Sequence, residues 1–264
     1  MHHRNATPGA LPRRALIAIT GATAPLGKDG DVTGLFISEA LHPYIALRAA
    51  GFEVDMASET GSYTPDALSQ TEAMLNGEDL AIWKDVNSDF RKKLDNMPKA
   101  ADLNPSDYGL FYASAGHAAL IDYPTATNLQ KIASSVWIRG GVVASVCHGA
   151  AIFANVVDEN GEHIIKGKRV AGFSNAEEEV LKVMEQLKSW KVELVEDLAA
   201  RVGATCKLRI HDVLIKLANI CPDESAEPWA DFHIVDGRLC CGQNPQSATS
   251  TAKDAIRVFD SVRA

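Results

Sequence analysis

Long hydrophobic runs are absent from this sequence. A membrane-spanning helix needs about 20 consecutive apolar residues, whereas the longest runs here, such as 15–19, have the length of a single buried strand. The first dozen residues also lack the apolar core of a secretory signal, so we expect residues 1–13 to form a disordered lead-in. We therefore expect no membrane partner.

Positive charge and cysteine are both scarce. The 26 Lys and Arg are outnumbered by 34 Asp and Glu, and the net charge of −8 argues against nucleic acid as a partner. The five cysteines show no Cys-x-x-Cys spacing, which argues against a disulfide framework and favours a reducing compartment, the cytoplasm with the nucleus as an alternative. Small molecules or proteins are the expected partners.

Recognisable cofactor motifs are missing as well. Eight histidines are scattered without a His-Glu-x-x-His or comparable cluster, so a metal site has little support. The glycines after the first apolar run form neither a Walker loop nor a Gly-x-Gly-x-x-Gly fingerprint, so nucleotide binding is not supported. We expect neither a metal nor a cofactor.

The chain does contain a regular alternation of short apolar runs and longer helical patterns. A hairpin is also expected around Asp236-Gly237. The predicted strands cover 14–20, 52–58, 105–113, 142–146 and 170–173, and the predicted helices cover 35–50, 124–139, 195–203 and the segments after 174 and 247. This alternation predicts one α/β domain over 14–264, with a doubly wound, mainly parallel sheet and helices on both faces.

One stretch has the pattern of a nucleophile elbow, in which a strand turns sharply into a helix. The apolar run 142–146 stops at Cys147 and continues with His148 and Gly149. The corner residue of an elbow has a strained backbone and projects over the sheet edge, and the following helix N-terminus is expected to lower a thiol pKa there. A cysteine after an apolar run is equally typical of a core residue, so the motif alone leaves both readings open.

Two other segments are expected to meet this corner, because ligands of parallel sheets bind at the carboxyl ends of the strands. The predicted strand that ends at residue 113 is followed by small residues, beginning with Ser114. Their backbone amides suit an oxyanion site. Glu39 lies among apolar residues near Pro43, so the helix either begins close to Glu39 or kinks beyond it. The alternative reading of Glu39 is a solvent-facing helix residue.

Ordered motifs run through most of the chain, at 39–43, 58–61, 113–117, 122–124, 140–150, 172–174, 236–239 and 242–245. Together they resemble the ThiJ/PfpI superfamily, and within it the branch of fungal glutathione-independent glyoxalases (glyoxalase III) and heat-shock chaperone-like proteins. The resemblance implies a flavodoxin-like fold and a homodimer. Residues 205–226 stand where the family has a short loop, and we expect an inserted segment there.

The resemblance also implies a catalytic set. Cys147 corresponds to the nucleophile, His148 to its acid/base partner, and Glu39 to the carboxyl group that contacts the sulfur. Glu178 is the best match to the acid that orients the histidine, with its neighbours in 177–179 as alternatives, since first-turn glutamates are also common helix electrostatics.

An oxyanion and substrate-binding group is implied beside this set. It contains Gly116, His117 and Gly149, and the amides of Gly116 and His148 would hold the developing negative charge. No metal belongs to it.

The implied reaction is the cofactor-independent conversion of methylglyoxal or a similar 2-oxoaldehyde to a 2-hydroxy acid such as D-lactate. The thiolate would attack the aldehyde to form a hemithioacetal. The alternatives are a stress-inducible chaperone or holdase, a protein deglycase and, ranked lower, a cysteine peptidase or amidase, which would need an open groove.

Overall fold

A six-stranded sheet forms the centre of the molecule, with the strand order β4-β1-β5-β6-β10-β9. The computed structural model describes residues 11–27, 30–206 and 229–263. The strands of the sheet are β1 (Arg14–Ala18), β4 (Glu53–Ala57), β5 (Leu110–Ala113), β6 (Val142–Val146), β9 (His233–Asp236) and β10 (Leu239–Gly242). Only the hairpin β9-β10 pairs antiparallel in this sheet, and it turns at Asp236-Gly237 as predicted.

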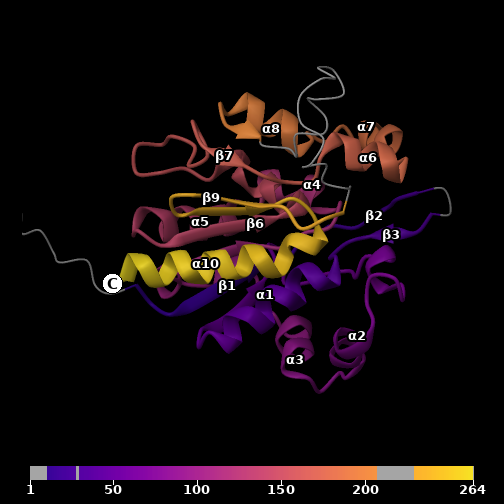
Figure 1. Cartoon of the computed structure of the whole chain (residues 1–264), viewed down its shortest axis with the longest axis horizontal. Coiled ribbons are helices and arrows are strands. Elements are labelled where there is room, and N and C mark those ends of the chain that lie inside the picture. Colours follow the sequence, from indigo (N-terminus) through magenta and orange to yellow (C-terminus); the bar gives the residue numbers. More distant parts are fainter. Residues whose placement is uncertain (1–10, 28–29, 207–228, 264) are drawn as a thin grey trace, which may run out of the picture.

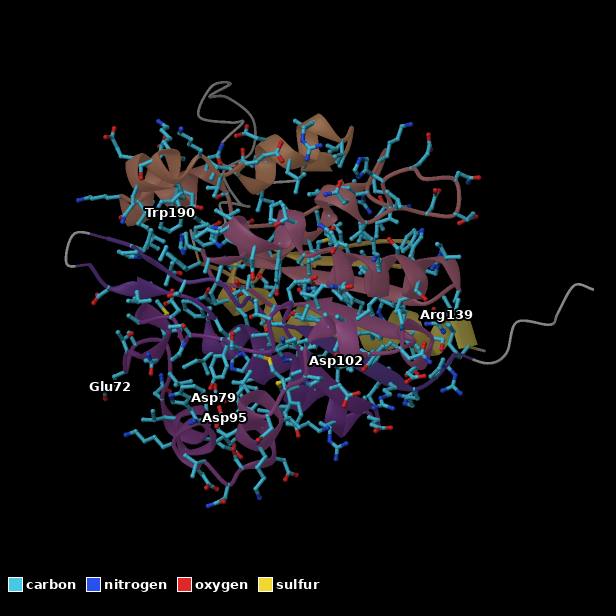
Figure 2. The ribbon with its side chains drawn as sticks, turned by 180° about the vertical axis from the view of Figure 1, so that it is seen from behind. Glu72, Asp79, Asp95, Asp102, Arg139 and Trp190 are labelled. Atoms are coloured by element: carbon cyan, nitrogen blue, oxygen red, sulfur yellow. The ribbon has the colours of Figure 1, made fainter. Side chains whose placement is uncertain are left out.

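Helices cover both faces of this sheet (Figure 1). Helices α1 (Ile37–Ala49) and α10 (Ala248–Arg263) pack side by side over one face. Helix α5 (Thr127–Ile138) packs against β5 and β6 on the other face, which Figure 2 shows from behind. The predicted fold class, a doubly wound α/β structure with a mainly parallel sheet, is confirmed.

Shorter elements surround these layers. The helices are α2 (Gly77–Lys84), α3 (Asp89–Asp95), α4 (Ala119–Asp122), α6 (Asn175–Leu181), α7 (Met184–Trp190) and α8 (Val195–Arg201). Two ribbons add β2 (Ala24–Pro25) with β3 (Val32–Thr33), and β7 (Arg169–Val170) with β8 (Thr205–Cys206). No helix in the described part of the chain has the length and apolar character needed to cross a membrane.

Two predicted segments lie largely outside the described residues. The expected insertion at 205–226 is described only at 205–206, and the expected lead-in at 1–13 only from residue 11. Within that lead-in, Nε of Arg13 donates to the Ala50 carbonyl oxygen at 3.0 Å. The single domain over 14–264 stays a prediction.

The inner strands β1, β5, β6 and β10 are buried on both faces, which is why their sequences are nearly continuous apolar runs instead of alternating ones. All five residues of β6 and the last four of β1 are buried. Polar chemistry is therefore confined to the strand ends. The carboxyl ends of β1, β5 and β6 lie next to one another in the sheet, and the loops that follow them form one edge.

Helix α1 begins just before Glu39, which settles one of the two alternatives left by Pro43. The amide of Glu39 donates to the carbonyl oxygen of Phe36 at 3.0 Å, so Glu39 lies in the first turn. Pro43 has no N–H to offer the Glu39 carbonyl. The start of the helix thereby places the Glu39 carboxyl group at the edge of the sheet where the carboxyl ends of the strands lie.

Helices α2 and α3 form a small layer that carries Asp79 and Asp95 (Figure 2), and these two carboxylates connect it to the rest of the molecule. Nε2 of His42 on α1 lies 2.7 Å from Oδ2 of Asp79, and the Tyr63 hydroxyl donates to Oδ1 of Asp95 at 2.6 Å. These contacts involve partly exposed groups, so they orient the layer more than they stabilise it.

We expect Gly149→Ala to destabilise the fold. A Cβ at Gly149 would overlap the backbone carbonyl oxygen of Ala113, so β5 and the turn after β6 would have to separate, at a cost of about 1–3 kcal/mol. Urea unfolding followed by circular dichroism measures this. The control is Gly161→Ala, where a Cβ meets open space and only the φ of +78° is unfavourable. A smaller loss at Gly149 than at Gly161 would contradict the close approach.

Candidate active site

Cys147 occupies a sharp corner between β6 and a 3₁₀-helix, Cys147–Asn155. Its φ is +56°, a conformation that residues other than glycine adopt rarely. The corner is held by the amide of Phe173, which donates to the Cys147 carbonyl oxygen at 3.3 Å. Strained residues of this kind cluster at functional sites, because the surrounding structure must over-determine them. The geometry matches the predicted elbow.

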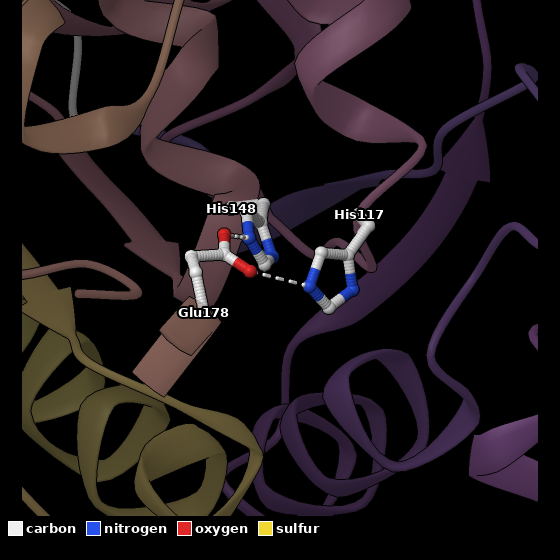
Figure 3. Close-up of side chains that lie close together, drawn as sticks. All are labelled: His117, His148 and Glu178. Atoms are coloured by element: carbon white, nitrogen blue, oxygen red, sulfur yellow. Dashed lines mark hydrogen bonds and ion pairs between the residues drawn. The ribbon is translucent and has the colours of Figure 1, made fainter. Parts of the chain in front are cut away.

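A chain of polar contacts leads away from the sulfur. Sγ of Cys147 lies 3.2 Å from Nδ1 of His148, and Nε2 of the same ring lies 2.7 Å from Oε1 of Glu178 (Figure 3). An ionised carboxylate can only accept, so Nε2 of His148 carries the proton and Nδ1 is the acceptor that faces the thiol. This is the arrangement of a nucleophile, a base and an orienting acid.

Glu178 is the glutamate that reaches the histidine, because consecutive helix residues point in different directions. Glu177 belongs to a capping box: its side chain accepts from the Ser174 amide at 2.9 Å, and it also accepts from Nδ2 of Asn244 at 3.0 Å. Glu179 is exposed. Of the three alternatives in 177–179, the structure therefore brings Glu178 alone to His148.

Glu39 is completely buried beside this chain. Burial raises the pKa of its carboxyl group well above the ordinary value, the nearby Cys147 thiol and the Ala115 amide offset this only in part, and Asp66 adds to it. Within the described residues neither carboxyl oxygen meets the geometry of a full hydrogen bond, so these contacts are loose. The raised pKa favours the neutral form of the Glu39 carboxyl group near the sulfur.

The thiol itself differs from the prediction. Burial raises the pKa of Cys147 well above its ordinary value, and a charge on Glu39 would raise it further. The backbone N–H of His148 lowers it, but by less than burial raises it. The expectation of a lowered thiol pKa was wrong for the resting protein, because only 3% of Cys147 is exposed and one amide does not replace the lost water.

The histidine and its acid are shifted in opposite senses. Burial, together with the neighbouring His117, lowers the pKa of His148 to about 4, although Glu178 opposes this. Burial also acts against ionisation of Glu178, but His148 and His117 outweigh it and lower the pKa of Glu178 to about 2. At neutral pH the resting site therefore holds a thiol, a neutral imidazole and a carboxylate.

The predicted oxyanion and substrate group lies around the same corner. Gly116 has a φ of +145°, and a Cβ there would overlap the carbonyl oxygen of Gly34, so only glycine fits. Gly149 packs against β5 as described above. His117 contributes more than its backbone: Nε2 of its ring lies 2.9 Å from Oε2 of Glu178. This contact spans 61 residues, and no local sequence pattern signals it.

The potential metal-ligand atoms of His117, His148 and Glu178 lie within 4.8 Å of one another, so these three residues could hold a metal ion. Each imidazole Nε2 is already paired with one oxygen of the carboxylate, so these polar atoms are satisfied without an ion. Their arrangement is that of a hydrogen-bonded relay around the thiol.

Aromatic rings and a cavity complete the surroundings. Phe173 packs against the His148 ring at a centroid distance of 4.6 Å and against Trp229 at 5.6 Å. A cavity of about 230 Å³ reaches His117 and is otherwise lined by residues such as Phe36, Asp66 and Leu181. The imidazole of His117 thus lies between this cavity and Glu178.

Comparisons with known proteins agree with the geometry. No family model matches the chain. Glyoxalase 3 of Candida albicans is 42% identical over 248 residues, which are 94% of this chain and 98% of that protein. The glutathione-independent glyoxalase HSP31 of Saccharomyces cerevisiae is 41% identical over 253 residues, 96% of this chain and 99% of its own.

Solved structures extend this likeness to three dimensions. The crystal structure of glyoxalase III from Candida albicans superposes with a TM-score of 0.84 at 42% identity, covering 95% of this chain and 98% of that chain. A ThiJ/PfpI domain protein from Brachyspira murdochii, with a TM-score of 0.53 at 12% identity, shares the fold. Because two curated relatives match over nearly their full lengths, the chain belongs to the glutathione-independent glyoxalase family.

Proposed function

We propose that this protein converts methylglyoxal and similar 2-oxoaldehydes to 2-hydroxy acids, D-lactate in the case of methylglyoxal, without glutathione. The observation that carries the proposal is the buried chain from the Cys147 thiol through His148 to Glu178, with the carboxyl group of Glu39, whose pKa is raised by burial, beside the sulfur. A thiol nucleophile, a base and a neutral acid are the groups that this reaction needs.

The first step is addition of the thiol to the aldehyde. Nδ1 of His148 takes the thiol proton, the sulfur bonds to the aldehyde carbon, and the former carbonyl oxygen takes that proton from Nδ1, so that a hemithioacetal forms and His148 is neutral again. The raised pKa of the thiol means that the sulfur keeps its proton until the aldehyde is bound, so proton transfer to His148 accompanies the attack on the aldehyde carbon. The amides of Gly116 and His148 would stabilise the developing oxyanion.

The second step moves hydrogen within the substrate. A base, His148 or the ionised form of Glu39, removes the proton from the former aldehyde carbon, and the resulting enediol is reprotonated on the neighbouring carbon. This leaves a thioester of the 2-hydroxy acid, which water hydrolyses to release the thiol. One carbon is oxidised and its neighbour is reduced, so the only co-reactant is one water molecule.

The surroundings favour a small substrate over a polypeptide. Cys147 is 3% exposed, and the cavity beside His117 has a volume of about 230 Å³. A peptidase would need an open groove that receives an extended chain. A homodimer, which the resemblance implies, and a cytoplasmic or nuclear location, which the cysteine pattern favours, accompany this proposal as predictions.

Replacement of Cys147 by alanine is expected to abolish the reaction. Without the sulfur no hemithioacetal forms, so D-lactate production should fall at least about a thousandfold. The assay uses purified protein with methylglyoxal, a chelator and no glutathione. Cys240→Ala, which removes another buried thiol, is the control and should keep most of the activity. Full activity of Cys147→Ala would refute the mechanism.

Glu39→Gln tests whether the pKa of Glu39 is raised in the folded protein. Because burial raises its pKa, neutral Glu39 stabilises the fold fully below its unfolded pKa of about 4.3, and this advantage is lost as pH rises through the folded pKa. Glutamine cannot ionise. The unfolding free energy of the variant should therefore gain on wild type by about 1.4 kcal/mol per pH unit over that window.

The same variant should lose activity by about a hundredfold or more, since an amide cannot exchange a proton with the substrate. Urea titrations over a pH series and D-lactate assays measure the two effects separately. Glu72→Gln, at an exposed glutamate (Figure 2), is the matched control and should change neither. A flat stability difference between Glu39→Gln and wild type would rule out the raised pKa.

A further inference from the structure

The ring of His117 has no part in the mechanism above, yet it belongs to the same buried cluster. Figure 3 shows the two imidazoles approaching one carboxylate from different sides. Oε1 of Glu178 faces His148 at 2.7 Å, and Oε2 faces His117 at 2.9 Å. The two rings also pack on each other, with a centroid distance of 4.1 Å.

The second oxygen of Glu178 needs a donor, because the carboxylate is almost completely buried. Without His117, Oε2 would be a buried charged acceptor without that partner, which favours either protonation of Glu178 or rotation of the carboxyl group. Both changes would loosen the bond that holds Nε2 of His148. The ring could then turn or change tautomer, and Nδ1 would no longer be a fixed acceptor for the thiol proton.

Other ionisable groups around Glu178 are committed elsewhere. Its neighbour Glu177 accepts from Ser174 and Asn244. On the packed helix α8, Glu196 accepts from the Asn175 amide at 2.6 Å. Cys147 lies on the far side of His148, and Glu39 lies beyond the sulfur. The two imidazoles are therefore the N–H donors to this carboxylate in the described part of the chain.

We propose that His117 is a positioning residue whose Nε2–H holds Oε2 of Glu178, so that Oε1 fixes His148 with Nδ1 toward the sulfur of Cys147. The inference deepens the proposed function, because it rests on Cys147 as the nucleophile of that reaction. It assigns a role to the imidazole that differs from an oxyanion contact through the backbone.

A pair of variants separates hydrogen bonding from ring packing. His117→Phe keeps an aromatic ring against His148 and Phe173 but removes the N–H. His117→Gln removes the ring but keeps an N–H donor of similar reach. If His117 acts as a hydrogen-bond donor, glutamine should preserve the pKa of Glu178 and phenylalanine should raise it. If His117 only fills space, the order is reversed.

The main readout is the ionisation of Glu178, followed by the carboxyl ¹³C chemical shift in glutamate-labelled protein across a pH series. We expect the pKa of Glu178 in His117→Phe to rise by roughly one to two pH units, and that in His117→Gln to stay within about half a unit of wild type. Equal shifts in both variants, or no shift in His117→Phe, would overturn the proposal.

A second readout follows the thiol directly. The rate at which iodoacetamide alkylates Cys147, located by peptide mass spectrometry, should fall by roughly tenfold in His117→Phe at neutral pH and less in His117→Gln. The control is His233→Phe, which breaks the surface pair with Asp254 and should leave this rate unchanged. An equal loss at both positions would overturn the role of His117.

The wild-type protein provides a further test, which does not depend on the folding of any variant. Imidazole ¹⁵N shifts report the tautomer of each histidine, and the proposal requires a proton on Nε2 of both His117 and His148. A proton on Nδ1 of His117 would overturn it. Neither alkylation nor NMR depends on methylglyoxal turnover, so an absent glyoxalase activity would refute the proposed function and leave the role of His117 to be decided separately.

Discussion

The carboxylate of Glu178, buried between two imidazoles, is the group on which the rest of the site depends. A buried anion is tolerated only when donors replace its hydration, and here each oxygen receives one N–H. Since the carboxylate cannot donate, it dictates the tautomer of His148. That tautomer in turn decides that the thiol faces an acceptor.

The same exclusion of water acts in opposite ways on the two carboxyl groups. Glu178 has its donors and its pKa is lowered, whereas Glu39 has only loose contacts to a thiol and an amide and its pKa is raised. The site therefore contains one carboxyl group whose pKa is raised and one whose pKa is lowered. Two glutamates acquire two roles from their surroundings alone.

Much of this arrangement can be predicted from the sequence, and the failures have definite physical causes. The elbow is local: an apolar run, Cys147 and Gly149 specify it. The identity of the orienting acid could also have been narrowed, because Ser174-x-x-Glu177 is a capping-box signature that assigns Glu177 to the helix start. The shift of the thiol pKa was mispredicted because a local helix terminus was weighed without the burial that only the packed structure provides.

The ring of His117 lay beyond such reasoning for another reason. Its partner is 61 residues away, and a histidine in a run of small residues carries no sign of which carboxylate it will meet. Contacts of this kind depend on how α6 sits over the strand ends. They are the part of an active site that local patterns do not specify.

The hydrogen bonds that Glu177 accepts affect how the active site unfolds. Helix α6 has seven residues, fewer than an isolated helix needs to persist in water. It is held by hydrogen bonds that Glu177 accepts from Ser174 and from Asn244, which lies just after β10. Local opening of the segment that carries Asn244, just after β10, would therefore release α6 and move Glu178 away from His148 while the strands of the sheet stay paired.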